Sequence, residues 1–277
     1  PPLKILSVGR RVWTHPSNRR QRVRALSRAV RWQLTKRLTG RSIDYDLPSG
    51  LRLRVHPDSA AASSVLYSSG LPDHAEMAFA AEYLRAGDNF VDVGANIGSY
   101  VLFVAPLIGK RGRIVAFEPG EVAHRRLSEN VTINGLDSRV ELRREAAAAE
   151  NGTARFSNDR DTQNALSEDG SGVEVATVRL DDAVHGQFAL GKLDLEGAEP
   201  MALEGARRLL FSADPPVWLL EINRVALRRF GSDEERLADQ LAQSGFDLFT
   251  YDPDERVLTR LADHDEHAAV QGIDRGQ

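Results

Sequence analysis

The stretch Asn89-Phe90-Val91-Asp92-Val93-Gly94-Ala95-Asn96-Ile97-Gly98 determines the fold of this chain. An apolar run reaches an acid, a glycine-rich turn follows, and an amphipathic segment comes next, so the order predicts a strand, a turn and a helix. Twenty-six residues after Asp92, a second apolar run ends in Glu118. A doubly wound α/β sheet holds adenosine-bearing cofactors with this arrangement, at the carboxyl edge of its strands.

The spacing of the glycines distinguishes two classes of such cofactor. A dinucleotide carries a pyrophosphate, which a GxGxxG turn meets with bare backbone and a helix N-terminus. Here the turn from Gly94 to Gly98 reads GxxxG, and Asp92 puts an anion where a pyrophosphate would be repelled. S-adenosylmethionine has no phosphate, and its methionyl end carries an ammonium that suits an acid. The turn therefore predicts a methyltransferase, with a nicotinamide-dependent oxidoreductase as the alternative.

The residues expected to bind the cofactor follow from this interpretation. Glu118 would accept hydrogen bonds from the ribose hydroxyls, a role that does not distinguish the two cofactor classes. Each acid also has a plainer alternative, because Asp92 could cap a helix and Glu118 could be an exposed acid at a strand end. A third strand over residues 139–142 would place its end near the adenine. The expected binding residues are Asp92, Gly94, Ala95, Asn96, Gly98, Glu118, Pro119, Glu145 and Ala146.

A second motif, Gly191-Lys192-Leu193-Asp194-Leu195-Glu196-Gly197-Ala198-Glu199, bears on the chemistry. A short strand ends at Asp194, which should face the methyl group. We interpret Asp194 or Glu196 as the base or the acceptor-orienting residue, and Lys192 as holding the carboxylates in their charged form. Glu196 and Glu199 could instead be first-turn helix acids, and for Glu199 we prefer that interpretation.

A metal site at the same edge is a further, less favoured hypothesis. Asp194, Glu221 and Asn223 offer the hard oxygen ligands that Mg²⁺ prefers, and a metal would acidify a bound hydroxyl. Carboxylates at neighbouring strand ends are as often only the polar rim of a pocket. The cofactor prediction is therefore S-adenosylmethionine, with Mg²⁺ not favoured.

These motifs resemble the FkbM family of S-adenosylmethionine-dependent methyltransferases. The resemblance covers roughly residues 43–250 and is most specific in the motif from Lys192 to Glu199. It implies a seven-stranded α/β methyltransferase fold that usually acts on a hydroxyl of a sugar or secondary metabolite. The family usually has Tyr and Thr after the glycine turn, where this chain has Ser99-Tyr100-Val101. The other matching runs are residues 90–98, residues 112–119, residues 127–134 with their two asparagines, and Leu180-Asp181-Asp182.

The charge distribution divides the chain. Of 36 basic and 40 acidic residues, twelve basic residues and no acid lie in residues 1–43, so the remainder has a net charge of −16. Residues 1–16 show no clear period, and a basic amphipathic helix follows and ends near Gly40. Its apolar residues recur in three- and four-residue steps, namely Val23, Leu26, Val30, Leu34 and Leu38.

This basic arm has two interpretations. It could attach to an anionic surface, which could be a membrane, a nucleic acid or an acidic carrier protein. It could instead pack its apolar stripe on the acidic body or on a second subunit of a homodimer, which is the interpretation that we favour. A non-catalytic protein that binds the cofactor and is attached elsewhere through the arm is a third functional alternative.

The domain prediction has three parts: a basic arm over residues 1–42, a methyltransferase domain over residues 43–262 that begins with a hairpin at 43–55, and a polar tail over residues 263–277. The sheet is expected to be doubly wound and Rossmann-like, with seven strands of which the last is antiparallel. Residues 151–172 are polar and are expected to form a long loop, either a lid or a segment that faces the substrate. Residues 246–251 and 256–261 are expected to be paired strands.

Composition limits the remaining possibilities. The chain has no cysteine, which excludes disulfides and cysteine chemistry. No apolar run approaches the ~20 residues that span a bilayer, and the first residues show no secretory signal. We therefore expect a cytoplasmic enzyme with a small-molecule substrate.

Overall fold

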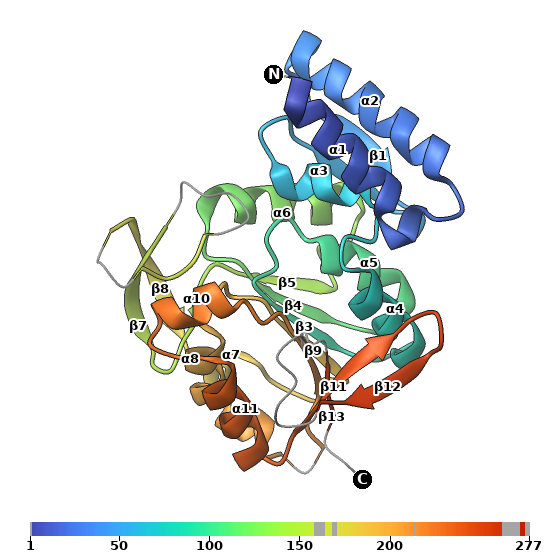
Figure 1. Cartoon of the computed structure of the whole chain (residues 1–277). Coiled ribbons are helices and arrows are strands. Elements are labelled where there is room, and N and C mark those ends of the chain that lie inside the picture. The colour runs from blue at the N-terminus through green and yellow to red at the C-terminus, as the bar shows by residue number, and fades with distance from the viewer. Residues whose placement is uncertain (1, 158–163, 168–170, 213, 262–271, 275–277) are drawn as a thin grey trace.

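A computed structural model describes residues 2–157, 164–167, 171–212, 214–261 and 272–274 (Figure 1). An eight-stranded sheet forms its centre, and five neighbouring strands of that sheet are parallel. In spatial order the five are β10 (Val217–Leu220), β9 (Leu190–Leu193), β3 (Phe90–Val93), β4 (Ile114–Phe117) and β5 (Val140–Arg143). The predicted α/β class is confirmed.

The chain changes direction across the sheet at β3. It runs from β3 outward to β4 and β5, and later returns to β9 and β10 on the other side of β3. Asp92 of β3 lies level with Ala116 of β4 and with Lys192 of β9. The carboxyl ends of β3 and β9 therefore meet at the switch point, where open α/β sheets bind ligands.

Three more strands, each joined to its neighbour by antiparallel pairing, complete the sheet beyond β10. They are β11 (Asp247–Asp252), β12 (Val257–Arg260) and β13 (Gly272–Asp274), so the sheet has eight strands rather than the predicted seven. The predicted pairing of β11 with β12 is confirmed. The segment expected as a polar tail contains β13, which pairs antiparallel with both β10 and β11. Because β10 and β11 run in the same direction, a single strand of opposite direction between them can form antiparallel hydrogen bonds with both. Residues 262–271 and 275–277 lie outside the described residues.

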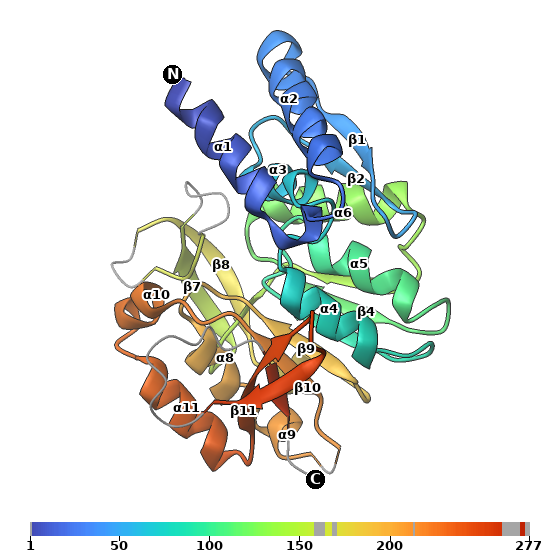
Figure 2. The same cartoon turned by 45° about the vertical axis from the view of Figure 1, so that its right-hand side comes forward.

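Helices cover both faces of the sheet (Figure 2). Alternate residues of each strand point to opposite faces, so Phe90 packs with one set of helices and Val91 with the other. The first set is α4 (His74–Tyr83), α5 (Ser99–Leu107) and α6 (Glu121–Ile133). The second set is α7 (Leu180–Ala183), α8 (Glu199–Glu204), α9 (Arg207–Leu210), α10 (Arg224–Arg229) and α11 (Glu234–Gln243).

A small second sheet borders the carboxyl edge of the main one. Its order is β6-β8-β7, made by β6 (Ala146–Ala147), β7 (Gly152–Phe156) and β8 (Val173–Val178). The expectation of a long loop over residues 151–172 is therefore wrong for β7, which pairs antiparallel with β8. Only Phe156 of β7 is buried, so the strand has too few apolar residues for its alternation to show. Residues 158–163 and 168–170 lie outside the described part of the chain.

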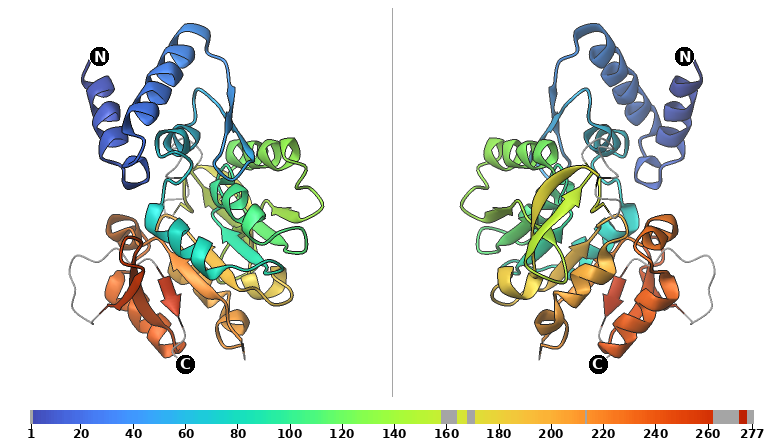
Figure 3. Two further views of the ribbon diagram at one scale, coloured as in Figure 1. Left: turned by 90° about the vertical axis from the view of Figure 1, so that its right-hand side faces the viewer. Right: turned by 90° about the vertical axis from the view of Figure 1, so that its left-hand side faces the viewer.

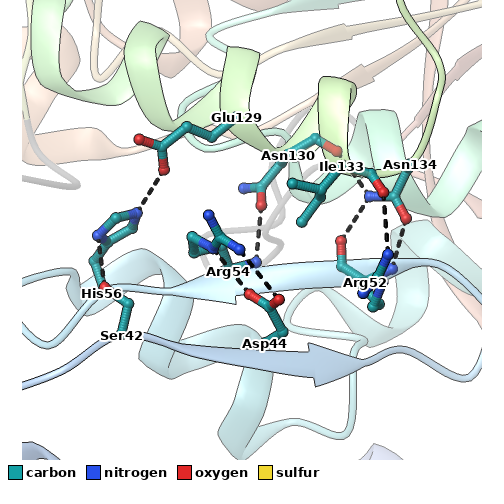
Figure 4. Close-up of polar contacts among 9 residues, drawn as sticks. All are labelled: Ser42, Asp44, Arg52, Arg54, His56, Glu129, Asn130, Ile133 and Asn134. Carbon is teal, nitrogen blue, oxygen red and sulfur yellow. Dashed lines mark hydrogen bonds and ion pairs between the residues drawn. The ribbon is translucent and has the colours of Figure 1, made fainter.

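Asn130 of α6 and Asn134, the C-cap of that helix, hold the predicted hairpin, β1 (Ile43–Asp46) and β2 (Arg52–Val55), against the domain (Figure 4). The Asn134 side chain accepts from the Arg52 N–H at 2.8 Å and donates to the Arg52 carbonyl at 2.7 Å. One turn earlier, Asn130 accepts from the Arg54 N–H at 2.8 Å and donates to the Ile97 carbonyl at 2.9 Å. The two amides therefore pair with β2 as a neighbouring strand would, and Asn130 also anchors the glycine turn after β3.

Replacing Asn130 with alanine is expected to destabilise the protein by about 2–4 kcal/mol, because the Arg54 N–H and the Ile97 carbonyl would each lose a partner in or beside the core. Asn130 is buried. Urea unfolding of the variant measures the loss. Thr132→Ala on the exposed face of the same helix is the matched control, and it should change the free energy of unfolding by less than about 0.5 kcal/mol. Equal losses in the two variants would contradict this role.

The basic arm is a pair of helices, α1 (Pro2–Thr14) and α2 (Arg22–Thr39), joined by η1 (Pro16–Asn18). Residues 1–16 show no clear helical period, so the sequence does not predict α1. The end of α2 at Gly40, which is left-handed with φ +61°, is as expected. Figure 3 shows both helices standing out from the body on one side.

The face of α2 that packs on the body differs from the predicted one. Ala25, Ala29 and Trp32 are buried there, and Trp32 Nε1 donates to Ser63 Oγ of α3 (Ala60–Tyr67) at 3.0 Å. The two alanines allow the helices to approach closely. Of the predicted stripe, Leu26 is partly buried and four residues are exposed, namely Val23, Val30, Leu34 and Leu38.

Candidate active site

A crevice lies where the carboxyl ends of β3, β4 and β9 meet the small sheet. The turn after β3 forms its floor, the end of β4 forms one wall, and the turn after β9 forms the other. Its lining residues are Gly94, Asn96, Glu118, Pro119, Ala146, Ala147, Phe156, Asn164, Ala165, Leu166, Asp194, Leu195, Glu196 and Ala198.

Asp92 is a buried acid at this edge with unused hydrogen-bonding capacity. Asp92 is 1% exposed, and neither of its carboxylate oxygens has a hydrogen-bond partner among the described residues. Burial raises the pKa of Asp92 to about 7, with Asp194 and Asp73 adding to the rise and Lys192 opposing it. Leaving a buried carboxylate without donors is costly. Such an acid is suited to a cationic, hydrogen-bond-donating ligand.

The glycine turn after β3 can be built only with glycine at its key positions. Gly94 has φ +91°, and a Cβ there would lie 1.9 Å from the Asp194 carbonyl oxygen. The backbones of the two motifs therefore touch. At Gly98, with φ +88°, a Cβ would lie 2.6 Å from Leu127 of α6. The turn thus leaves bare backbone facing the crevice.

Glu118, at the end of β4, is fixed by the backbone on both sides. Its carboxylate accepts from the Asn96 N–H at 2.8 Å and from the Gly120 N–H at 2.7 Å. Burial raises the pKa of Glu118 to about 7, and the two backbone donors oppose that rise. Each oxygen keeps a second acceptor site, so Glu118 can brace the turn and still accept from a ligand.

The other expected binding residues divide by position. Pro119 and Ala146 line the crevice, and so does Phe156, which the sequence analysis did not assign. Glu145 is absent from the lining, and its carboxylate accepts from Arg143 Nη2 at 2.8 Å. Nothing local in the sequence marks Phe156, because its place depends on the pairing of β7 with β8.

Lys192 and Asp194 form a close ion pair beside Asp92. Lys192 Nζ donates to Asp194 Oδ2 at 2.7 Å and lies 4.9 Å from the centroid of the Tyr100 ring. Burial alone would lower the pKa of Lys192, but Asp194, Asp92 and Asp73 together raise it well above its usual range. Lys192 therefore stays protonated within a cluster of acids.

The two glutamates after Asp194 differ in their roles. Glu196 has the left-handed φ of +52°, and burial, together with Asp194 and Glu199, raises its pKa to about 7. Glu199 is buried and accepts from the N–H groups of Leu195 and Gly197, at 2.8 Å and 3.3 Å. Glu199 therefore braces the turn, while Glu196 accepts from Asn223 Nδ2 at 3.4 Å and titrates near neutral pH.

The residues weighed for Mg²⁺ have other partners here. Asn223 Oδ1 caps α10 by accepting from the N–H groups of Val225 and Ala226. Glu221 is exposed, and the nearby Asp194 carboxylate raises its pKa. In the described residues no group of three or more His, Asp or Glu side chains is arranged to hold a metal ion.

With the site described, comparison with known proteins gives the family. The sequence model described as "Methyltransferase FkbM domain" matches residues 92–248, more than half of the chain. The chain belongs to the FkbM methyltransferase family. The resemblance seen in the motifs is therefore confirmed.

Solved structures similar to this FkbM methyltransferase share little sequence with it. A methyltransferase FkbM from Methylobacillus flagellatus KT is 16% identical with a TM-score of 0.45, and the match covers 85% of this chain and 59% of that chain. An S-adenosylmethionine-dependent O-methyltransferase from Thermotoga maritima is 13% identical with a TM-score of 0.39, covering 72% and 63%. Aeropyrum pernix fibrillarin, with bound S-adenosyl-L-methionine, is 15% identical with a TM-score of 0.39, covering 69% and 67%. No curated protein sequence matches the chain.

A second, larger cleft of this FkbM methyltransferase lies outside the matched residues 92–248, on the side of the Lys192 cluster. Its volume is about 710 Å³, and it is lined by His15, Pro16 and Arg19 of the arm, by the start of α4, and by the β11–β12 hairpin. Asp73, the N-cap of α4, and Glu76 of α4 line it and interact electrostatically with Lys192 and Asp194. The crevice and the cleft thus approach the same ion pair. Three segments far apart in the sequence form the cleft, which is why no local motif indicated it.

Burial raises the pKa of both cleft acids. At Asp73, Asp194 adds to the rise while Lys192 and a hydrogen bond from Tyr100 oppose it. At Glu76, Asp73 and Asp194 add to the rise. The end of the cleft nearest Lys192 is therefore polar and can accept hydrogen bonds from a ligand.

Proposed function

We propose that this FkbM protein is an S-adenosylmethionine-dependent O-methyltransferase whose acceptor is a hydroxyl of a polar small molecule, such as a sugar or a secondary metabolite. The observation that supports this most is the buried, unpartnered carboxylate of Asp92 next to the Lys192–Asp194 pair. An anion there suits a cationic donor and does not suit a pyrophosphate, which argues against the oxidoreductase alternative.

Residues in the crevice and in the buried strand end beside it would each meet a different part of the cofactor. Asp92 would hold the methionyl ammonium, the backbone from Gly94 to Gly98 would carry the amino-acid part, and Glu118 would accept from the ribose hydroxyls. The adenine would lie among the apolar side chains of Ala146, Phe156 and Leu166. When bound, the cofactor supplies a methyl group that its sulfonium charge has already activated.

The chain's own residues then have to position the acceptor and take its proton. Asp194 lies where both cavities approach, and its carboxylate can accept a hydrogen bond from an acceptor hydroxyl. Lys192 donates to that carboxylate at 2.7 Å and orients it. Glu196, with its pKa near 7, is the alternative proton acceptor, because a base works best when its pKa lies near the working pH.

The lining of the larger cleft supports a polar acceptor. Carboxylates, histidines and an arginine outnumber apolar side chains along it. Groups of this kind bind hydroxyl-rich molecules through several hydrogen bonds at once.

Incubation of the full chain with methyl-labelled S-adenosylmethionine and fractions of small-molecule extracts tests the proposal. We expect one product that gains a single methyl group, and fragmentation should place that methyl on an oxygen. Transfer only to nitrogen or carbon would refute O-methylation, and transfer to no acceptor in any fraction would contradict the proposed function.

Cofactor affinity should rise with pH between about 5.5 and 7.5. The ionised form of Asp92 binds the ammonium, and burial holds its pKa near 7 in the free protein. Below that pKa, each unit by which the pH falls should weaken cofactor binding about tenfold, because a proton must leave Asp92 before the ligand binds. Calorimetry with S-adenosylmethionine measures the profile. Asp92→Asn should lose most of the slope, and a flat profile in the unaltered protein would contradict the assignment.

A further inference from the structure

The α1–α2 arm exposes an apolar surface that the fold does not use. We call it the arm face; it consists of Trp13, Val23, Val30, Leu34 and Leu38, whose exposed fractions are 44%, 74%, 48%, 52% and 81%. A groove of about 500 Å³ runs between the two helices, and Trp13, Val30 and Leu34 line it. Contiguous exposed apolar surface of this kind marks an interaction site.

The arm is held to the body by its opposite side, so the arm face is not an unfinished core. Trp32 of α2 is buried against α3, and Asn18 donates to the carbonyls of Val12 and Tyr67 at 2.8 Å and 2.7 Å. Figure 3 shows the two helices projecting past the sheet. The arm is therefore a fixed platform whose outward side is open in this structure.

The arm's own charged side chains all have one sign. Residues 1–43 contain no acid, and Arg22 lies over the Trp13 ring at 5.5 Å. Arg19 pairs with Asp254 of the β11–β12 hairpin. Other exposed arginines of the arm have no ion pair with an acid among the described residues, namely Arg10, Arg20, Arg22, Arg24, Arg31 and Arg37.

We propose that the arm face docks on the surface of an anionic lipid bilayer. Aliphatic residues and a tryptophan between arginines are what an interfacial helix needs, because the apolar side enters the headgroup boundary while the arginines meet anionic headgroups. No described helix is long and apolar enough to cross a membrane, so the contact lies at the surface.

Two other partners fit the arm face less well. Nucleic acid would use the arginines but leaves Val23, Val30, Leu34 and Leu38 without an apolar contact. A second copy joined through the same face would bring two sets of arginines together without an acid.

The turn between α1 and α2 borders the larger cleft through His15 and Arg19. Docking therefore places that cleft beside the membrane.

Vesicle flotation with the full chain tests the proposal. The unaltered protein should float with vesicles that contain phosphatidylglycerol but not with pure phosphatidylcholine, and added salt should weaken the binding. Val30→Glu with Leu34→Glu should lower binding roughly tenfold or more. Val122→Glu on α6, where Val122 is 45% exposed, is the matched control and should bind as the unaltered protein does. Cofactor calorimetry verifies that each variant is folded.

Several outcomes would overturn the proposal. Equal flotation with both vesicle types, or unchanged flotation of the double variant, would show that the arm face is not the lipid-binding surface. Sedimentation showing a dimer without lipid that the double variant converts to a monomer would assign the face to self-association. Tight RNA binding that the double variant retains, without flotation, would assign the arginines to nucleic acid.

Discussion

Asp194→Asn is expected to lower kcat by roughly 10²- to 10⁴-fold while leaving the affinity for S-adenosylmethionine nearly unchanged. Asparagine keeps the shape of the side chain and can still accept from Lys192, which lies 2.7 Å from the carboxylate. It cannot take a proton from the acceptor hydroxyl. Single-turnover kinetics with labelled cofactor, together with calorimetry, separate the chemical step from binding.

Two further variants make that prediction specific. Glu196→Gln should lower kcat less than Asp194→Asn if Asp194 is the base, and more if Glu196 is. Lys192→Met removes the cation that donates to Asp194 at 2.7 Å and orients it, so it should also lower kcat. Asp194→Asn with kcat within about threefold of the unaltered protein would remove Asp194 from the chemistry.

Asp92→Asn should weaken S-adenosylmethionine binding about 100-fold and at the same time stabilise the ligand-free protein above pH 7. Loss of a charge-assisted contact with the ammonium accounts for the weaker binding. The stability gain follows from burial, which raises the pKa of Asp92 from 3.8 to about 7. An acid with a raised folded-state pKa loses stability as pH rises from the unfolded value through the folded one.

Asparagine avoids this loss because it stays neutral at every pH. A difference of about three pKa units corresponds to at most about 4 kcal/mol, and each kcal/mol moves the Tm of a domain of this size by about 2–4 °C. Thermal unfolding at pH 8 and pH 5, with and without cofactor, measures the effect. The gain should be present at pH 8 and shrink toward pH 4. Lower stability of the variant at pH 8 would show that Asp92 is structural.

The sequence predicted the site's framework because the framework is local. The strand before Gly94 is a continuous apolar run, and the turn needs glycine for steric reasons that the structure makes explicit, since a Cβ at Gly94 would meet the Asp194 carbonyl oxygen. Asp92 and Lys192 lie side by side on β3 and β9, because the two apolar runs form neighbouring strands of one parallel sheet.

Features that depend on packing between distant segments were not predicted correctly. The inward side of α2 uses Ala25 and Ala29, which are too small to form a visible hydrophobic stripe, so the pattern of larger residues such as Val30 and Leu34 indicates the wrong packing face. The α6 asparagines were visible as a motif, but their role with β2 needed the hairpin in place. The larger cleft required three segments to come together.

A crystal structure of the full chain with S-adenosylhomocysteine, the demethylated product, tests the central claim most directly. We expect the amino-acid ammonium to bond to the Asp92 carboxylate, directly or through one water, and the ribose hydroxyls to donate to Glu118. An empty crevice at saturating ligand, or a bound nucleoside that leaves both carboxylates without contact, would contradict the account.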